Sequence, residues 1–345
     1  MKNILSKVLQ FTLFTAVGSA ILYYVYYTQN AGWLEDKVQN PHGDSLLTKM
    51  LSDFGSVRLF WIFATMAAFT VSNLARALRW EMLLEPLGYK PRTRNTYLAI
   101  MAAYLANLAI SRVGEVVRCT LVSRYEKIPV NVLFGTVVVD RALDVLCLLA
   151  CVGLAFIMQF RKIYDFLTTN ADITSKLSIF ESPLFWALVV VGSVGLLLAY
   201  RYRARVAHLA IYEKIRSMIL GFWDGIKTIG SLKNPALFVT YTIVIWGMYY
   251  LMTYLCFFSF APTENLGLVA ALTVFVFGSF GIVIPSPGGM GSFQFLTTAA
   301  LVLYGVRGGD AFSFANIQFI TVNLCIIFFG TLAFIAMPLM NRASK

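Results

Sequence analysis

The sequence predicts an all-α polytopic membrane protein, and three observations carry this prediction. Hydrophobic residues make up 59% of the 345 residues and charged residues only 13%, whereas a soluble globular domain carries about 25% charged residues. The apolar residues fall in long runs, and a helix needs about 20 of them to span a bilayer. Two of the runs are interrupted, one by charged residues and one by prolines and glycines. We therefore expect a single membrane domain over residues 1–345.

The excess of basic residues does not indicate nucleic-acid binding. Lys and Arg number 28 against 17 Asp and Glu, but most lie in short loops between apolar runs, which is the positive-inside pattern of membrane proteins. The five cysteines form no C-x-x-C pair, and the two histidines, His42 and His208, are far apart in the sequence. Neither a disulfide framework, a metal site nor a cofactor is therefore expected.

The first half of the chain, about residues 1–160, begins with two predicted spans. Val8–Tyr27 ends in a run of tyrosines, which is typical of an interfacial belt, so it is interpreted as an uncleaved first helix. Residues 30–58 are expected to form an outside loop. The second span runs from Leu59 to about Leu78 and ends in Arg76, Arg79 and Trp80. Because further basic residues follow, the next loop is placed in the cytoplasm.

The next apolar run is predicted to enter the membrane and return to the same side. Thr96–Ile110 is short for a complete crossing, and the chain turns polar over Ser111–Arg118 before it recovers at Val122. A complete crossing would place the later basic loops outside, against the positive-inside rule. A re-entrant hairpin removes the conflict, because irregular backbone is tolerated where it lines a protein cavity. Val130–Gln159 then spans the membrane.

The second half, about residues 183–345, repeats this order. Residues 161–181 form the expected outside loop before it. Residues 201–233 contain seven basic and two acidic residues with apolar residues at helical spacing, which predicts a cytoplasmic amphipathic helix region. The remaining predicted membrane segments are Leu184–Tyr200, Ala236–Phe258, a second hairpin over Leu266–Val306, and Ala311–Met337.

Each half can therefore be described as two spans, a broken re-entrant hairpin and a further span. The first half starts inside and the second outside, so the halves are predicted to be inverted repeats with both chain termini in the cytoplasm. Paired broken helices in inverted repeats are typical of secondary transporters, with the site near the midplane. The alternative is a plain series of helices with two long loops.

Charged residues gather around the first break and in the span that follows it. A charge inside a bilayer is costly and by default marks a pathway or a binding site. Arginine can hold a phosphate through a bidentate fork, but the same groups can also form a fully paired lock between hairpin and span. Both interpretations stay open for the six residues, which are Arg112, Glu115, Arg118, Asp140, Arg141 and Asp144. On one helix edge, Glu115 is expected to lie between Arg112 and Arg118.

Polar and flexible residues at the two breaks supply further candidates. Backbone N–H groups of the Pro- and Gly-rich break could approach an anion, with Ser286, Gly288 and Gly289 as candidate contacts; a plain turn is the alternative. Asn107 and Gln294 stand at the mouths of the two breaks and could line the same cavity, with simple hydrogen bonding as the alternative. The sequence contains no G-x-S-x-G, H-E-x-x-H or P-loop motif, so we do not expect an enzyme.

Three blocks occur in order along the chain: Asn107 with R-x-G-E-x-x-R at 112–118, V-D-R-x-x-D at 139–144 and P-S-P-G-G-x-G at 285–291. Together they resemble the lysylphosphatidylglycerol synthase transmembrane-region family, also called flippase-like membrane proteins. The resemblance covers nearly the whole chain, although the family often has Glu where this chain has Asp140. It implies a bacterial or archaeal inner-membrane protein with two re-entrant elements. The full-length synthases carry a soluble aminoacyl-transfer domain, and this chain, which ends at Lys345, is expected not to make lysylphosphatidylglycerol.

From the residues and the resemblance we expect a flippase or transporter for an anionic or phosphate-bearing lipid, either a phospholipid or a lipid-linked group. Arg112, Arg118 and Arg141 would hold the head group, while the carboxylates position the arginines or balance their charge. The alternatives are a membrane-embedded transferase acting on a lipid phosphate, and a non-transporting partner of a lipid-modifying enzyme. The expected partner is a membrane lipid, and homo-oligomerisation stays open.

Overall fold

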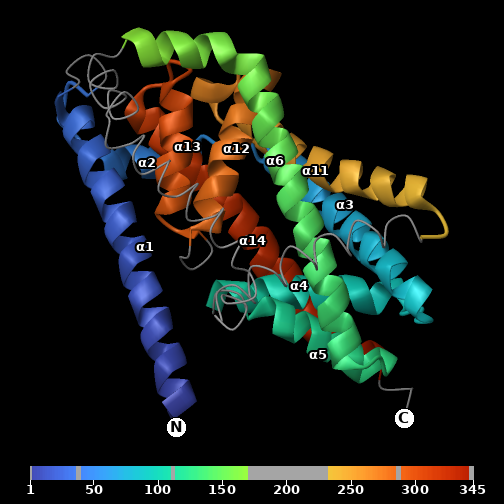
Figure 1. Cartoon of the computed structure of the whole chain (residues 1–345). Coiled ribbons are helices and arrows are strands. Elements are labelled where there is room, and N and C mark those ends of the chain that lie inside the picture. The colour runs from blue at the N-terminus through green and yellow to red at the C-terminus, as the bar shows by residue number, and fades with distance from the viewer. Residues whose placement is uncertain (1, 36–39, 110–112, 170–231, 285–288, 342–345) are drawn as a thin grey trace, which may run out of the picture. The chain divides into compact units, whose positions relative to one another are not determined.

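The computed structural model is helical and describes residues 2–35, 40–109, 113–169, 232–284 and 289–341 (Figure 1). Two compact units can be distinguished: residues 1–151 with 229–345 form the first, and residues 152–228 the second. The candidate site lies in the first unit, to which the description below applies. The predicted span Leu184–Tyr200 and almost all of the predicted amphipathic region, residues 201–233, lie outside the described residues.

The elements follow the predicted order closely. The longer helices are α1 (Lys2–Glu35), α3 (Leu59–Leu84), α6 (Val130–Thr169), α11 (Pro235–Phe257) and α14 (Gly308–Met340). The shorter ones are α2 (Leu46–Gly55), α4 (Thr93–Ala109), α5 (Gly114–Glu126), α12 (Leu268–Val283) and α13 (Ser292–Val302), with 3₁₀ turns η1 (Glu85–Leu87) and η2 (Ala261–Thr263). The predicted outside loop over residues 161–181 begins as helix, because α6 continues to Thr169.

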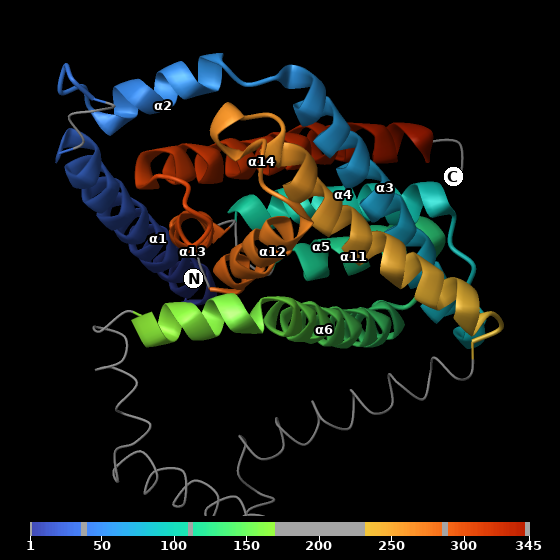
Figure 2. The same ribbon diagram turned by 90° about the horizontal axis from the view of Figure 1, so that it is seen from above.

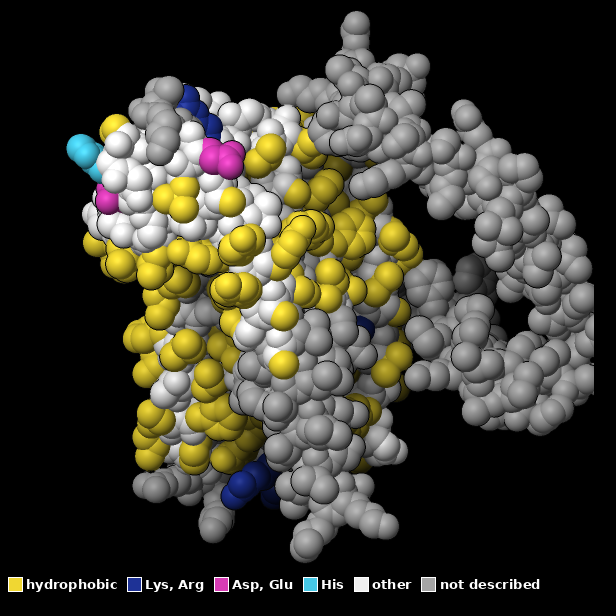
Figure 3. Space-filling model, turned by 90° about the vertical axis from the view of Figure 1, so that its left-hand side faces the viewer, with side chains coloured by type: hydrophobic (Ala, Val, Ile, Leu, Met, Phe, Trp, Pro, Cys, Tyr) yellow, Lys and Arg dark blue, Asp and Glu magenta, His cyan; other side chains and the backbone are white. Residues whose placement is uncertain are grey.

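Within the described residues, four helical stretches are long and apolar enough to cross a membrane. Many of their large hydrophobic side chains are exposed, such as Leu149 and Leu324, as expected of surfaces that face lipid. Figure 3 shows a broad hydrophobic band on one face, with acidic and basic side chains above it and Lys and Arg at its lower edge. The protein is therefore a multi-pass membrane protein. The four stretches are Leu59–Leu87, Val130–Gln159, Pro235–Phe257 and Gly308–Met340.

Two pairs of short helices, the α4–α5 hairpin and the α12–α13 hairpin, pack helix against helix. Each pair is closed by a glycine. A Cβ on Gly114 would clash with the carbonyl oxygen of Ala103, and a Cβ on Gly281 would lie 2.6 Å from the Cα of Phe293. Only glycine permits such an approach of two backbones.

The longer helices hold these hairpins in place. α3 and α11 pack along each other, and α3 contacts α4 as α11 contacts α12. The two hairpins contact opposite halves of α14 (Figure 2): Gly330 lies against Leu105 of α4, and the Phe319 ring lies 5.8 Å from the tilted Phe293 ring of α13 between centroids. α14 thus connects both hairpins.

The end of the α4–α5 hairpin away from its break is fixed by hydrogen bonds. Asn95, in the first turn of α4, donates to the Glu126 carboxylate at the end of α5. The amides of Asn95 and Asn341 bond each other reciprocally, at 3.1 and 3.0 Å. The C-terminal end of α14 is thereby joined to α4 directly and to α5 through Asn95.

Candidate functional site

Buried arginines of α3 face buried aspartates of α6. Asp140 and Asp144 are one helical turn apart and therefore share a face of α6. The Arg79 Nη2 atom lies 2.6 Å from Asp140 Oδ1 and 2.8 Å from Asp144 Oδ1. Arg76 Nη1 lies 2.7 Å from Asp144 Oδ2 and 3.5 Å from Asp140 Oδ2. The side chains of Arg79 and Asp140 are fully buried and that of Arg76 nearly so, so these pairs join α3 to α6.

Arg118 enters this group from α5. Its Nη1 atom lies 3.2 Å from Asp140 Oδ2, and its guanidinium carbon lies 3.6 Å from the centre of the Trp80 ring, which is cation–π geometry. The side chain is only 2% exposed, and its Nε and Nη2 atoms have no hydrogen-bond partner among the described residues. Two buried donors of Arg118 are therefore uncommitted within that part of the chain.

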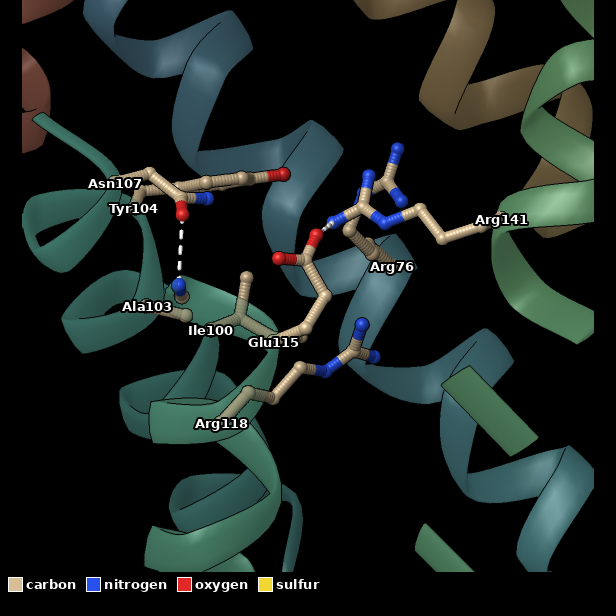
Figure 4. Close-up of a pocket in the computed structure, with 9 residues that line it drawn as sticks. Arg76, Ile100, Ala103, Tyr104, Asn107, Glu115, Arg118 and Arg141 are labelled. Atoms are coloured by element: carbon tan, nitrogen blue, oxygen red, sulfur yellow. Dashed lines mark hydrogen bonds and ion pairs between the residues drawn. The ribbon is translucent and has the colours of Figure 1, made fainter. Parts of the chain in front are cut away.

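Glu115 and Arg141 form an outer and more accessible pair (Figure 4). Glu115 Oε1 lies 3.1 Å from Arg141 Nη2, and Arg141 Nη1 lies 3.5 Å from Asp144 Oδ2. Their side chains are 27% and 41% exposed. Glu115 Oε2 is buried without a hydrogen-bond partner in the described structure. We call the seven residues the charged cluster: Arg76, Arg79, Glu115, Arg118, Asp140, Arg141 and Asp144.

The charged cluster carries an excess of positive charge. Its four arginines face three carboxylates, which gives a formal net charge of +1. Because the local dielectric constant is low, one uncompensated charge attracts an anion more strongly here than it would in water. Among the described residues, no three His, Cys, Asp or Glu side chains come together as metal ligands.

A small pocket opens beside the charged cluster. In the observed arrangement it has room for about one water molecule. The hydroxyl of Tyr104 lies 3.3 Å from that of Tyr249, whose ring lies 5.7 Å from the Arg76 guanidinium. The pocket is lined by Arg76, Ile100, Ala103, Tyr104, Asn107, Gly114, Glu115, Arg118 and Arg141.

Comparison with known proteins places this arrangement in a family. The family described as "Lysylphosphatidylglycerol synthase TM region" matches residues 46–330, which is most of the chain. The protein belongs to this family. It is also 36% identical over 69 residues to the "UPF0104 membrane protein MJ1595" of Methanocaldococcus jannaschii, a match that covers 19% of this chain and 20% of the relative. The chain thus aligns with about a fifth of that relative's length. No solved structure matches.

Within this family member, Asn107 and Gln294 hold the restarting helices by hydrogen bonds. Asn107 Oδ1 accepts from the Gly114 N–H at 2.7 Å, and Gln294 Oε1 accepts from the Gly291 N–H at 2.8 Å. Each amide therefore satisfies a backbone donor that a helix end leaves free. The hydrogen-bonding interpretation is confirmed for both residues. Asn107 also lines the pocket, whereas Gln294 is absent from its lining.

The segment around the glycine-rich break, unlike the charged cluster, contains no charged residues. Gly289 and Gly291 adopt φ values of +80° and +84°, as tight turns of glycine permit. The Ser292 hydroxyl donates to the carbonyl oxygens of Gly281 at 2.6 Å and Gly289 at 3.2 Å. The sequence has no charged residue between Glu264 and Arg307. The candidate residues Ser286 and Gly288 lie outside the described residues.

Arg76 and Arg79 are not among the site residues predicted from the sequence. Both are buried in α3, which continues past the predicted end of the span at Leu78 to Leu84. Their spacing of three on one helical face was the signal that could have found them. Among the described ion pairs, Glu115 pairs with Arg141 and Arg118 with Asp140, both in α6. Arg112 lies outside the described residues.

Proposed function

We propose that this protein moves an anionic, phosphate-bearing lipid between the leaflets of its membrane, with the charged cluster as the head-group site. The observation that carries this proposal is Arg118, which is buried beside the pocket with two uncommitted donors. Burying a guanidinium that lacks its hydrogen bonds is expensive. A phosphate oxygen would satisfy the free donors and neutralise the excess positive charge.

The fixed planar guanidinium of Arg118 suits a phosphate better than a positive charge without a fixed geometry would. Its guanidinium rests on Trp80, and the Trp80 Nε1–H donates to Thr136 Oγ1 of α6 at 3.0 Å. The indole is therefore held between α3 and α6, and it fixes the plane of the guanidinium. A fixed planar fork matches two oxygens of a phosphate at once.

The head group cannot enter the site in the observed arrangement, because the pocket has room for only about one water molecule. We therefore propose an occluded state that opens when the α4–α5 hairpin moves relative to α6. The paired contacts of α3 with α4 and of α11 with α12 support two inverted halves with re-entrant hairpins, an architecture suited to alternating access.

We further propose an inner membrane of a bacterium or archaeon, with both termini in the cytoplasm. The support is the charge distribution of the loops. In a variant without native cysteines, a cysteine at His42, between α1 and α2, should react with a membrane-impermeant thiol reagent in intact cells. A cysteine at Lys90, between α3 and α4, should not react. The reverse labelling pattern would show that the orientation is wrong.

Arg118→Lys provides the test of the proposed site. Lysine keeps the charge that faces Asp140 but loses the planar fork and its stacking on Trp80. We expect the purified variant to remain folded and to move fluorescent phosphatidylglycerol across vesicle membranes at least about tenfold more slowly than wild type, a loss equivalent to one good charge-assisted hydrogen bond. Arg58→Lys is the matched control, because Arg58 forms an exposed ion pair with Glu264. If Arg118→Lys moved lipid at the wild-type rate, the charged cluster would be a structural lock and not a head-group site.

A further inference from the structure

The three carboxylates of the charged cluster differ in how firmly they are held. Asp140 is fully buried and contacts three arginines, and Asp144 is 13% exposed and also contacts three. Among the described residues, Glu115 makes a single ion pair, through one oxygen, to the most exposed arginine of the cluster. Its other oxygen is buried without a hydrogen-bond partner among the described residues. Glu115 is therefore the carboxylate that is least costly to displace.

The position of Glu115 in the chain sets it apart as well. It lies in the first turn of α5, directly after the break of the α4–α5 hairpin, whereas the two aspartates lie within α6. Glu115 and Arg141 both line the pocket. Figure 4 shows the Glu115 carboxylate pointing towards the Arg141 guanidinium, with Arg118 nearby on the same helix. The carboxylate thus occupies the space where an anion would meet these arginines.

We infer that Glu115 is an internal substitute for the substrate anion. In the observed arrangement its carboxylate pairs with Arg141, and an incoming phosphate replaces it there while also taking the free donors of Arg118. This inference rests on the proposed function and adds a reason for release. Since Glu115 and the phosphate compete for one guanidinium, the return of Glu115 helps to expel the head group.

Displacement of Glu115 also couples binding to movement of the hairpin. The Glu115–Arg141 pair is the one ion pair between α5 and the outer part of the charged cluster among the described residues. When phosphate breaks it, the Arg118–Asp140 pair is the described ion pair that still joins α5 to α6. Phosphate binding and the Glu115–Arg141 pair exclude each other. The free energy that this pair contributes to the closed hairpin therefore reduces the binding free energy of the phosphate by the same amount.

Glu115→Gln tests the inference by binding. The probe is dihexanoyl phosphatidylglycerol, titrated into the full-length protein in a neutral detergent and followed by calorimetry. Removing the competing charge while keeping the side-chain shape should tighten binding about tenfold, the equivalent of one partly buried ion pair. Lipid movement in vesicles should not rise in proportion, because release loses its competitor. Glu264→Gln, at the exposed pair with Arg58, is the control and should bind the probe as wild type does.

A second variant keeps the test valid should glutamine disturb folding. Glu115→Asp retains the charge but shortens the side chain, so the carboxylate is withdrawn from Arg141, and binding should again tighten. Unchanged or weaker binding in folded Glu115→Gln or Glu115→Asp, while wild type binds the probe and moves lipid, overturns this inference alone. A wild-type protein that neither binds the probe nor moves lipid overturns the proposed function, and the inference with it.

Discussion

The α4–α5 and α12–α13 hairpins are built alike and differ in charge. In each, a glycine brings two backbones together, Gly114 in the first and Gly281 in the second. In each, a side-chain amide accepts a backbone N–H next to the break, from Asn107 and from Gln294. Only the first hairpin contributes side chains, those of Glu115 and Arg118, to the charged cluster.

A broken hairpin can thus form without charged residues, and the charges of the first hairpin need a different explanation. In the second hairpin, hydrogen bonds such as that of Ser292 with Gly281 connect its own residues, and the Tyr250 hydroxyl of α11 donates to the Leu268 carbonyl oxygen. The first hairpin adds ion pairs that reach α6. A hairpin can therefore be closed by glycine and amide contacts alone, and we expect the charges of the first hairpin to serve recognition and coupling.

The largest effect is expected from Asp140→Ala, which removes the carboxylate shared by Arg76, Arg79 and Arg118. Leaving buried charges unpaired costs roughly 3–5 kcal/mol, so the variant should unfold or fail to accumulate in the membrane. Thermal unfolding in detergent, followed by size-exclusion chromatography, would measure this loss. A wild-type melting temperature would show that the inner pairs do not hold α3 to α6.

The next effect is expected from Gly114→Ala and Gly281→Ala. The added methyl group meets backbone atoms in both hairpins, and overpacking of this kind typically costs about 1–3 kcal/mol. Both variants should melt earlier, but only Gly114→Ala should also weaken binding of phosphatidylglycerol, because it displaces the turn that carries Glu115. Gly247→Ala in α11 is the control, since its Cβ would meet open space. Equal losses of phosphatidylglycerol binding in Gly114→Ala and Gly281→Ala would contradict the proposal that the first hairpin alone contributes to head-group binding.

A smaller effect is expected when the amide acceptors are removed. Asn107→Leu and Gln294→Met keep the side-chain size but leave the N–H groups of Gly114 and Gly291 without their acceptors. A hydrogen bond of this kind contributes about 1 kcal/mol, and somewhat more when the remaining donor is buried. The two variants should lose similar stability in urea or thermal unfolding. A clearly larger loss of lipid movement in Asn107→Leu would agree with its place in the pocket lining.

The smallest effect is expected from Glu264→Ala. This change removes the exposed partner of Arg58, at a distance of 2.5 Å, and surface pairs contribute at most about 1 kcal/mol. Comparison with Asp140→Ala in the same thermal assay shows how burial changes the importance of an ion pair. Similar losses in the two variants would mean that burial does not decide the stability of these pairs.

The sequence predicted the helical class and the two breaks because hydropathy and helix-breaking residues report them directly. It also predicted that Asp140, Arg141 and Asp144 lie in a helix long enough to span, which α6 confirms. It missed Arg76 and Arg79, since a hydropathy profile treats arginine as the end of a span even when the helix continues. The pairing of Glu115 with Arg141 depends on how α5 and α6 are rotated towards each other, and a single sequence does not specify that rotation.

The amide and carboxylate bonds at the far end of the α4–α5 hairpin limit how it can move. Asn95 connects Glu126 of α5 to Asn341 at the end of α14, so this end of the hairpin is tied to α14. Glu115 lies 11 residues before Glu126 on α5, which is about 17 Å along the helix. A small rotation of α5 about the tied end would therefore displace Glu115, beside the proposed head-group site, further than it displaces the residues near Glu126.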